Sequence, residues 1–155
     1  MPISLSYIIL PFDALSTTQL YDILQLRSRV FIVEQNIVYL DPDGYDQLSL
    51  HIGLYDDNTL VGCVRIIPPG VKFNDVSIGR FAVDISYRGK GWGTSLFRRA
   101  IDEIHARYGN VAITIEAQHY LKDYYRAMGF AAISEPYMLE GILHIKMQLP
   151  PVTKD

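Results

Sequence analysis

The sequence predicts an α/β fold in which a mixed, mostly antiparallel sheet is flanked by helices. Short apolar segments bounded by turn residues recur along the chain and indicate strands. Between them lie segments whose apolar residues recur every three or four positions, which is typical of amphipathic helices. The order is strand, helix, three antiparallel strands, helix, strand, helix and two strands, and this order predicts one layered α/β unit.

The first half of the chain is expected to contain a strand, a helix, a loop and two strands. Ser16 and Gln19 have the spacing of a capping box. An apolar stripe of helical period follows from Leu20 to Phe31, over about four turns. Turn residues without periodicity then predict an irregular loop. The helix is expected to begin after a cap at Ser16 and to extend to about Phe31. The other expected bounds are 5–10 for the strand, which Pro11 closes, 36–47 for the loop, and 49–55 and 60–67 for the two strands.

The second half is expected to place a glycine-rich turn between a strand and a helix. The turn reads Arg-Gly-Lys-Gly-Trp-Gly-Thr over residues 88–94. The helix after it has a buried face made of Leu96, Phe97, Ala100, Ile101 and Ile104. The expected bounds are 76–84 for the strand before the turn, 92–108 for the helix, 111–116 for a strand, 120–128 for a helix, and 130–134 and 144–149 for the last strands.

Composition predicts an ordinary globular protein. The 155 residues are expected to form one domain, 1–155, that buries roughly 70% of the surface of its unfolded chain. The net charge is −3 without a long basic run, so we expect no nucleic-acid partner. Cys63 is the one cysteine, which excludes an internal disulfide and fits a reducing cytoplasm. Neither a secretory signal nor an apolar run near 18 residues is present, so we expect no membrane partner.

No metal site is expected. The four histidines lack the spacing of metal ligands. Asp41, Asp43 and Asp46 resemble a calcium loop only in part, because Gly44 comes two places early and no glutamate follows at the twelfth position.

The turn over 88–94 has the sequence of a phosphate-binding site. A glycine-rich turn between a strand and a helix exposes successive backbone N–H groups beside the positive end of the helix dipole. The P-loop pattern is not met, and a dinucleotide fingerprint would need a third glycine where Thr94 stands. The pattern present is R-x-x-G-x-G.

Four motifs in order resemble those of the GNAT N-acetyltransferases, in particular their ElaA-like branch. The R-x-x-G-x-G turn resembles the acyl-CoA pyrophosphate loop of the family, and residues 125–130 resemble its Y-x-x-x-G-F segment. Residues 27–35 resemble R-x-x-V-F-x-x-E-Q of the ElaA-like branch, and 144–147 its closing H-I-x-M strand. The resemblance runs from about Leu20 to Met147. It implies an acetyl-CoA-dependent N-acetyltransferase whose central strands splay apart and whose acceptor is an amine of a small molecule or peptide.

The resemblance also implies where acetyl-CoA binds. The backbone of Phe81, Ala82 and Val83 would pair with the pantetheine arm, and the Val83 N–H would point at the acyl carbonyl. Gln118 would replace an asparagine that often follows the next strand in the family. The pyrophosphate would lie against Arg88, Gly89, Lys90, Gly91, Trp92, Gly93 and Thr94.

The same resemblance places Tyr125 at the general-acid position. A phenol with a pKa of about 10 can protonate a thiolate whose conjugate acid lies near 8.5 if the groups are aligned in a dry site. Tyr124, about 100° away around the helix, is the neighbouring alternative. Glu34 and Glu116 are the candidates for the general base, and His144 or a water chain are further alternatives.

Two buried arginines need partners. Arg27 lies on a buried helix face and Arg80 inside an apolar strand. Each would pair with an acid of the protein, such as Glu34, or with an acidic group of the acceptor.

Two other functions stay open. A non-catalytic acyl-CoA-binding module would keep the glycine turn and lose the general acid. An acyl-homoserine-lactone-type synthase would share a related fold but lack the glycine turn. The acceptor is expected to contact residues 36–47 and 136–142, and a homodimer stays among the alternatives for assembly.

Overall fold

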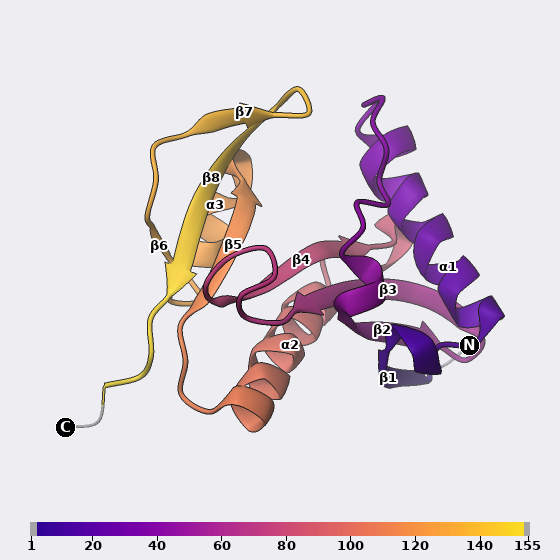
Figure 1. Cartoon of the computed structure of the whole chain (residues 1–155). Coiled ribbons are helices and arrows are strands. Elements are labelled where there is room, and N and C mark those ends of the chain that lie inside the picture. Colours follow the sequence, from indigo (N-terminus) through magenta and orange to yellow (C-terminus); the bar gives the residue numbers. More distant parts are fainter. Residues whose placement is uncertain (1–2, 154–155) are drawn as a thin grey trace.

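The structure is a computed structural model that describes residues 3–153. In this part of the chain eight strands form a sheet of order β1-β2-β3-β4-β5-β8-β6, and β7 pairs with β8 (Figure 1). Only β4 and β5 are parallel neighbours, so the sheet is mixed and mostly antiparallel, as predicted. The strands are β1 (Leu5–Pro11), β2 (Leu50–Asp56), β3 (Thr59–Ile67), β4 (Val76–Val83), β5 (Ile113–Gln118), β6 (Ala131–Ala132), β7 (Tyr137–Leu139) and β8 (Ile142–Leu149).

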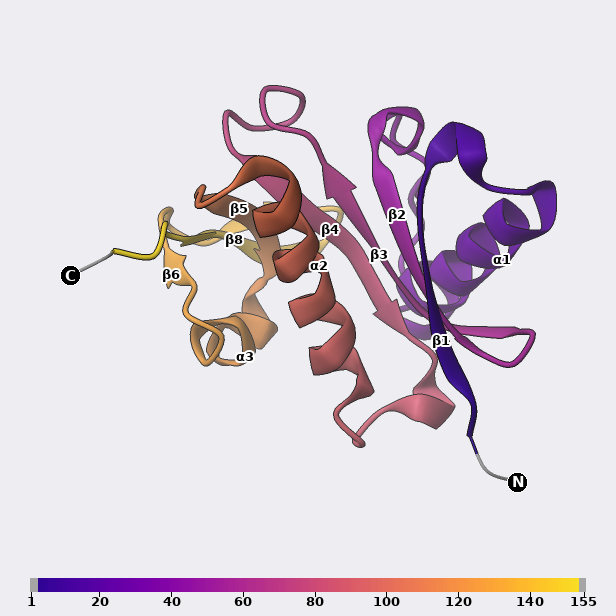
Figure 2. The same cartoon turned by 90° about the horizontal axis from the view of Figure 1, so that it is seen from below.

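Helices cover both faces of the sheet. The helix α1 (Thr17–Arg27) lies on one face, and α2 (Trp92–Tyr108) lies on the other with the short α3 (Lys122–Arg126) (Figure 2). The predicted buried face of α2 packs against the sheet, and its members are at most 9% exposed. Gly62 on β3 allows this close packing, because a Cβ there would lie 2.9 Å from a methyl carbon of Leu96. Over residues 3–153, no helix is both long and apolar enough to cross a membrane.

The first helical region begins as predicted and ends differently. The Ser16 hydroxyl accepts from the Gln19 N–H at 3.0 Å, and the Gln19 side chain accepts from the Ser16 N–H at 2.8 Å, so the capping box forms. The α-helix ends at Arg27, however, and a π-helical turn continues the rod over Ser28–Glu34. Val30 and Phe31 are buried in the π-helical turn, as the apolar stripe of an α-helix also predicts. The stripe therefore does not reveal the change from α-helix to π-helix.

The central strands splay apart, as the resemblance implied. The strands β4 and β5 share only two register pairs, Val76 with Ile113 and Ser77 with Thr114, and beyond them they do not pair. An irregularity in β4 sets in at Arg80, whose φ of +48° is rare outside glycine. The β4 backbone beyond this point therefore has no partner strand on the β5 side.

The last third of the chain contains elements that periodicity does not predict. A 3₁₀ turn over His119–Leu121 comes before α3 and leaves it shorter than expected. The strand predicted over 130–134 is only the two residues of β6, and β7 was not predicted. The hairpin β7–β8 turns at Glu140 and Gly141, which have φ values of +50° and +76°. A turn with two positive φ values usually has Asn or Asp at its first position, so the sequence Glu-Gly does not indicate a hairpin turn here.

Candidate active site

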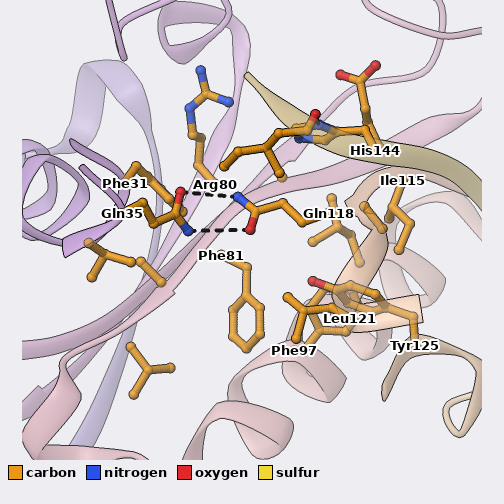
Figure 3. Close-up of a pocket in the computed structure, with 18 of the residues that line it drawn as sticks. Phe31, Gln35, Arg80, Phe81, Phe97, Ile115, Gln118, Leu121, Tyr125 and His144 are labelled. Carbon is orange, nitrogen blue, oxygen red and sulfur yellow. Dashed lines mark hydrogen bonds between the residues drawn. The ribbon is translucent and has the colours of Figure 1, made fainter. Parts of the chain in front are cut away.

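A cleft of about 860 Å³ opens where β4 and β5 diverge (Figure 3). Its walls are these two strands, the glycine turn, the end of the π-helical turn, and the hairpin β7–β8. The predicted site residues that line it are Glu34, Phe81, Ala82, Val83, Arg88, Gly89, Gly91, Gly93, Thr94, Glu116, Gln118, Tyr125 and His144. Lys90 and Trp92 lie outside the lining, where the Lys90 ammonium stacks 5.3 Å from the centre of a Trp92 ring.

The glycine turn presents backbone rather than side chains at the start of α2. Gly89 and Gly91 have φ values of +82° and +84°, which favour glycine. No side chain caps the helix, so the N–H groups of its first turn are available to a ligand. A Cβ at Gly93 would lie 3.3 Å from a Val83 methyl carbon and 3.4 Å from the Phe81 ring, so this glycine lets the helix approach β4.

The backbone of Val83 faces away from β3. The N–H of Asp84, the next residue, bonds to the Val61 carbonyl at 2.8 Å. Backbone groups of successive strand residues point to opposite sides, so those of Val83 point away from β3, on the side where β5 has diverged. The Val83 carbonyl accepts from Arg88 Nε at 2.9 Å.

Arg88 ties the turn to the end of the π-helical turn. Its two terminal nitrogens donate to the two carboxylate oxygens of Glu34 at 2.7 and 2.8 Å. This bidentate pair occupies both carboxylate oxygens of Glu34. The remaining guanidinium nitrogen of Arg88, Nε, donates to the Val83 carbonyl. The two residues were predicted separately, and the structure brings them together.

The two adjacent tyrosines of α3 have different surroundings. Tyr125 is 7% exposed, and its ring packs against Phe97 and Phe130 at centroid distances of 5.2 and 6.1 Å (Figure 3). Its hydroxyl has no hydrogen-bond partner within residues 3–153, and burial raises the pKa of Tyr125 above its ordinary value. The Tyr124 hydroxyl lies 2.8 Å from that of Thr94. Of these two adjacent tyrosines, Tyr125 is therefore the one whose phenol has no partner on the cleft wall.

Glu116 is bound on both oxygens. It accepts from the Tyr137 hydroxyl at 2.6 Å and from the Lys72 ammonium at 3.1 Å. Burial alone would raise the pKa of Glu116, but the hydrogen bonds and charge of these partners outweigh it and hold the pKa below its ordinary value. Sequence reasoning missed Lys72 and Tyr137, which lie in a loop and in the unpredicted β7.

A pair of amides crosses the cleft. Gln35 and Gln118 exchange two hydrogen bonds of 3.3 Å, one from each side chain (Figure 3). They join the end of the π-helical turn to the end of β5. Gln118 was predicted as a CoA contact, whereas Gln35 was noticed only as part of a motif.

The buried arginines pair with the loop over 36–47. Arg27 donates to Asp41 at 2.8 Å and to Asp46 at 2.7 Å, and Arg80 Nε lies 2.8 Å from Asp41. Arg65, which the sequence analysis did not single out, joins Asp43 and Asp46 at 2.7 and 3.0 Å. Loop aspartates, rather than Glu34 or an acceptor, thus neutralise these arginines. Among the described residues, no group of three or more His, Cys, Asp or Glu side chains is arranged to hold a metal ion.

The sequence is similar to a known protein family and to several of its relatives. The acetyltransferase (GNAT) domain model matches residues 39–150. The protein ElaA of Escherichia coli is 36% identical over 135 residues, which are 86% of this chain and 88% of that protein. A UPF0039 protein of Synechocystis is 35% identical over 143 residues, 90% of this chain and 93% of that protein.

Solved structures agree with the sequence comparison. The crystal structure of an acyl-CoA N-acyltransferase from Pseudomonas aeruginosa has a TM-score of 0.89 at 33% identity, over 94% of this chain and 99% of that one. The structure of Escherichia coli ElaA has a TM-score of 0.87 at 33% identity, with the same coverage. This chain therefore belongs to the GNAT acetyltransferase family, in its ElaA-like branch.

Proposed function

We propose that this chain transfers an acetyl group from acetyl-CoA to a primary amine of a small-molecule or peptidic acceptor. The observation that carries the proposal is the cleft, which joins three features that acyl transfer needs. These are the backbone at Val83, which has no partner strand on the β5 side, the uncapped helix start after Gly91, and the phenol of Tyr125 without a protein partner. Membership of the GNAT family supports the reaction class.

The chain's own groups fit the parts of acetyl-CoA. The N–H groups at the start of α2 suit a pyrophosphate, because they are uncapped and lie at the positive end of the helix dipole. The free side of β4 at Phe81–Val83 suits an extended amide-bearing arm, which would bond as an added strand does. The Val83 N–H is placed to donate to a carbonyl oxygen that gains negative charge. Acetyl-CoA would supply the activated thioester.

Tyr125 would protonate the departing sulfur. Its hydroxyl is on the cleft wall without a protein partner, and the raised pKa of Tyr125 keeps the phenol protonated at neutral pH. The rings of Phe97 and Phe130 pack against its ring and reduce its contact with water.

A thiol-release assay tests the function. The purified protein is incubated with acetyl-CoA and a panel of primary amines: a diamine, an arylalkylamine, an aminosugar and a peptide with a free N-terminus. We expect release of free thiol with at least one amine and a product heavier by one acetyl group. Propionyl-CoA and octanoyl-CoA run in parallel identify the donor.

The same purified protein also tests the alternative function, acyl-CoA binding without catalysis. CoA binding by calorimetry without thiol release from any donor and amine would favour a non-catalytic acyl-CoA-binding module. We also propose a cytoplasmic location, because the fully buried thiol of Cys63 is compatible with a reducing compartment.

A further inference from the structure

Acetyl transfer to an ammonium needs a group that accepts a proton, and Glu34 and Glu116, the two glutamates predicted as bases, are both already bound to other side chains. Both oxygens of Glu34 hold the guanidinium of Arg88, and both oxygens of Glu116 accept hydrogen bonds from Lys72 and Tyr137. The lowered pKa of Glu116 makes it a weaker base still. Proton removal therefore requires another side chain on the cleft wall or a water molecule.

His144 has a free nitrogen on that wall. Its Nδ1 lies 2.8 Å from the Ile142 carbonyl oxygen, which can only accept, so Nδ1 carries the hydrogen. In the neutral ring the lone pair then belongs to Nε2, for which residues 3–153 provide no hydrogen-bond partner. His144 lines the cleft beside Gln118, its cross-strand neighbour (Figure 3).

Neighbouring strands hold the imidazole in this orientation. Tyr137, its cross-strand neighbour on β7, stacks on it with a ring-centre distance of 6.4 Å and an angle of 26°. The Tyr137 hydroxyl in turn donates to Glu116, which lies two residues before Gln118 on the same face of β5. A carboxylate near the ring stabilises the positive charge that arises when the ring is protonated.

We propose that His144 Nε2 is the general base of the reaction, and that Tyr137 and Glu116 are positioning residues that orient the ring and stabilise its protonated form. The inference rests on the proposed acetyl transfer. Imidazole suits the task because its neutral ring has one nitrogen with a lone pair that can accept a proton.

His144, Tyr125 and solvent together account for every proton of the reaction. His144 takes one proton from the acceptor's ammonium and passes it to solvent. The amine lone pair forms the C–N bond to the acyl carbon, the C–S bond breaks, and its electron pair leaves with sulfur, which takes the Tyr125 proton. The nitrogen loses a second proton as the amide forms, and solvent carries it back to Tyr125. The net products are the amide, free CoA thiol and one proton.

Charged and titratable groups face His144 from several elements. Glu116 on β5, Tyr137 on β7 and Glu140 in the hairpin turn are acidic groups. The basic groups are Lys146 two residues along β8, Lys72 in the loop before β4, and Arg80 on the opposite wall. Lys72 is paired with Glu116, and Arg80 with Asp41.

The first test is the pH profile of kcat with acetyl-CoA and the panel amine that gives the highest turnover. We expect His144→Gln to lower kcat by about 10² to 10⁴ and to remove the low-pH limb. Glu116→Gln should keep the limb and move it to lower pH, because the protonated ring loses a stabilising charge. A lost limb in Glu116→Gln with an unchanged one in His144→Gln would overturn the assignment and make Glu116 the base.

Controls separate catalysis from folding. His105→Gln, on α2 and outside the cleft lining, should leave kcat unchanged. CoA affinity of His144→Gln should stay within threefold of the wild type by calorimetry. Added imidazole should restore part of the turnover of His144→Ala but not that of Tyr125→Phe. Failure of imidazole to act, with CoA binding intact, would contradict a base at this position.

A second test needs no acceptor and so distinguishes failure of this inference from failure of the proposed function. Nitrogen-15 NMR of the wild-type protein, with His144→Gln for assignment, identifies which ring nitrogen carries the hydrogen. Hydrogen on Nδ1 and protonation at Nε2 as the pH falls are expected even if no panel amine is acetylated. Hydrogen on Nε2 in the neutral ring would overturn the proposal.

Discussion

Tyr124 and Tyr125 are consecutive residues whose hydroxyls have different contacts. The Tyr124 hydroxyl is hydrogen-bonded to Thr94, and the Tyr125 hydroxyl has no partner in the described part of the chain. The motif selected Tyr125 from a set of eleven tyrosines, and the different contacts of the two hydroxyls are a physical reason to prefer it to its neighbour Tyr124. A proton donor must have a hydroxyl that is free to reach the reacting sulfur.

Tyr125→Phe should lower kcat by about 10² to 10⁴ and change acetyl-CoA affinity only severalfold. The phenyl ring keeps the packing against Phe97 and Phe130, and only the transferable proton is lost. The high-pH limb of the profile should disappear, because a phenol must be protonated to act. Steady-state kinetics and calorimetry on the same preparation check both statements.

Tyr124→Phe is the matched control for this substitution. It removes an adjacent hydroxyl from the same helix and should cost much less in kcat. Wild-type turnover or a surviving high-pH limb in Tyr125→Phe would refute the general-acid role. An unfolded Tyr125→Phe protein would instead show that the tyrosine is structural.

Side-chain partners are the part of the site that the sequence could not predict. Residues that lie in short motifs were found, because local spacing identifies them. Glu116 is bonded to Lys72 and Tyr137, which are 44 and 21 residues away, and Gln118 is bonded to Gln35, 83 residues away. Pairs so far apart leave no pattern in the local sequence. The pairing of Glu34 with Arg88, 54 residues apart, was hidden for the same reason.

At the level of elements, the glycine turn and the start of α2 at Trp92 were predicted, because glycine spacing and helical periodicity are local. The 3₁₀ turn Ile85–Tyr87 before the glycines was not. The π-helical turn, the strand β7 and the length of β6 were not predicted either. Tertiary pairing decides the two short strands, because β7 and β6 consist of three and two residues that pair with β8. The splay itself was inferred from family resemblance and not from periodicity.

Gly91→Val should weaken CoA binding at least tenfold. The residue has a φ of +84°, so a β-branched side chain forces the turn into another conformation. No protein atom lies within 4 Å of the added Cβ, so the effect would come from the altered turn and from blocked ligand approach rather than from a clash in the core. Calorimetric titration with CoA measures it.

Gly109→Val provides the control at the other end of the same helix. Gly109 has a φ of +80°, a ψ of −157° and equally open surroundings, so a side chain there strains the backbone at least as much as one at Gly91. Both variants should lose stability, but only Gly91→Val should lose CoA affinity. Equal loss of affinity in the two would mean that the helix as a whole, and not its first turn, controls binding.

At the level of the whole molecule, buried charges connect the cleft loop to the sheet. Burial alone would raise the pKa of Asp46, but bonds from Arg27 and Arg65 outweigh it and hold the pKa below its ordinary value. Burial lowers the pKa of His51, whose Nε2 is 2.9 Å from the Asp46 carbonyl oxygen. Of these groups, only Arg27 was recognisable in the sequence as a buried arginine in need of a partner.

Acid should destabilise the fold in two stages. Unfolded His51 binds a proton below about pH 6.5 while the folded form resists it, so stability declines from there as the pH falls. Asp46 and Glu116 have depressed pKa values in the folded state, so their contribution is lost below about pH 4. Urea unfolding at half-unit pH steps from 7 to 3 measures both stages.

His51→Gln should flatten the first stage. The variant has no group that titrates between pH 5 and 7 at this position, and the slope contributed per bound proton is at most about 1.4 kcal/mol per pH unit. His105→Gln is the control and should leave the slope as it is. An unchanged slope in His51→Gln would show that another group binds the proton on unfolding.

The divergence of β4 and β5 leaves the molecule with an edge strand in its interior. Amide groups along this edge have no ladder partner on the β5 side, and in the proposed binding mode the substrate would supply one and complete the sheet. Stability is then linked to cofactor supply: saturation at 100 times Kd adds about 2.7 kcal/mol. CoA should therefore raise the melting temperature and slow hydrogen exchange in β4 beyond Ser77 more than in β2, whose amides are already paired. Uniform slowing across both strands would contradict strand-like binding, and the expected pattern would make the cell's CoA pool a determinant of how long this protein survives.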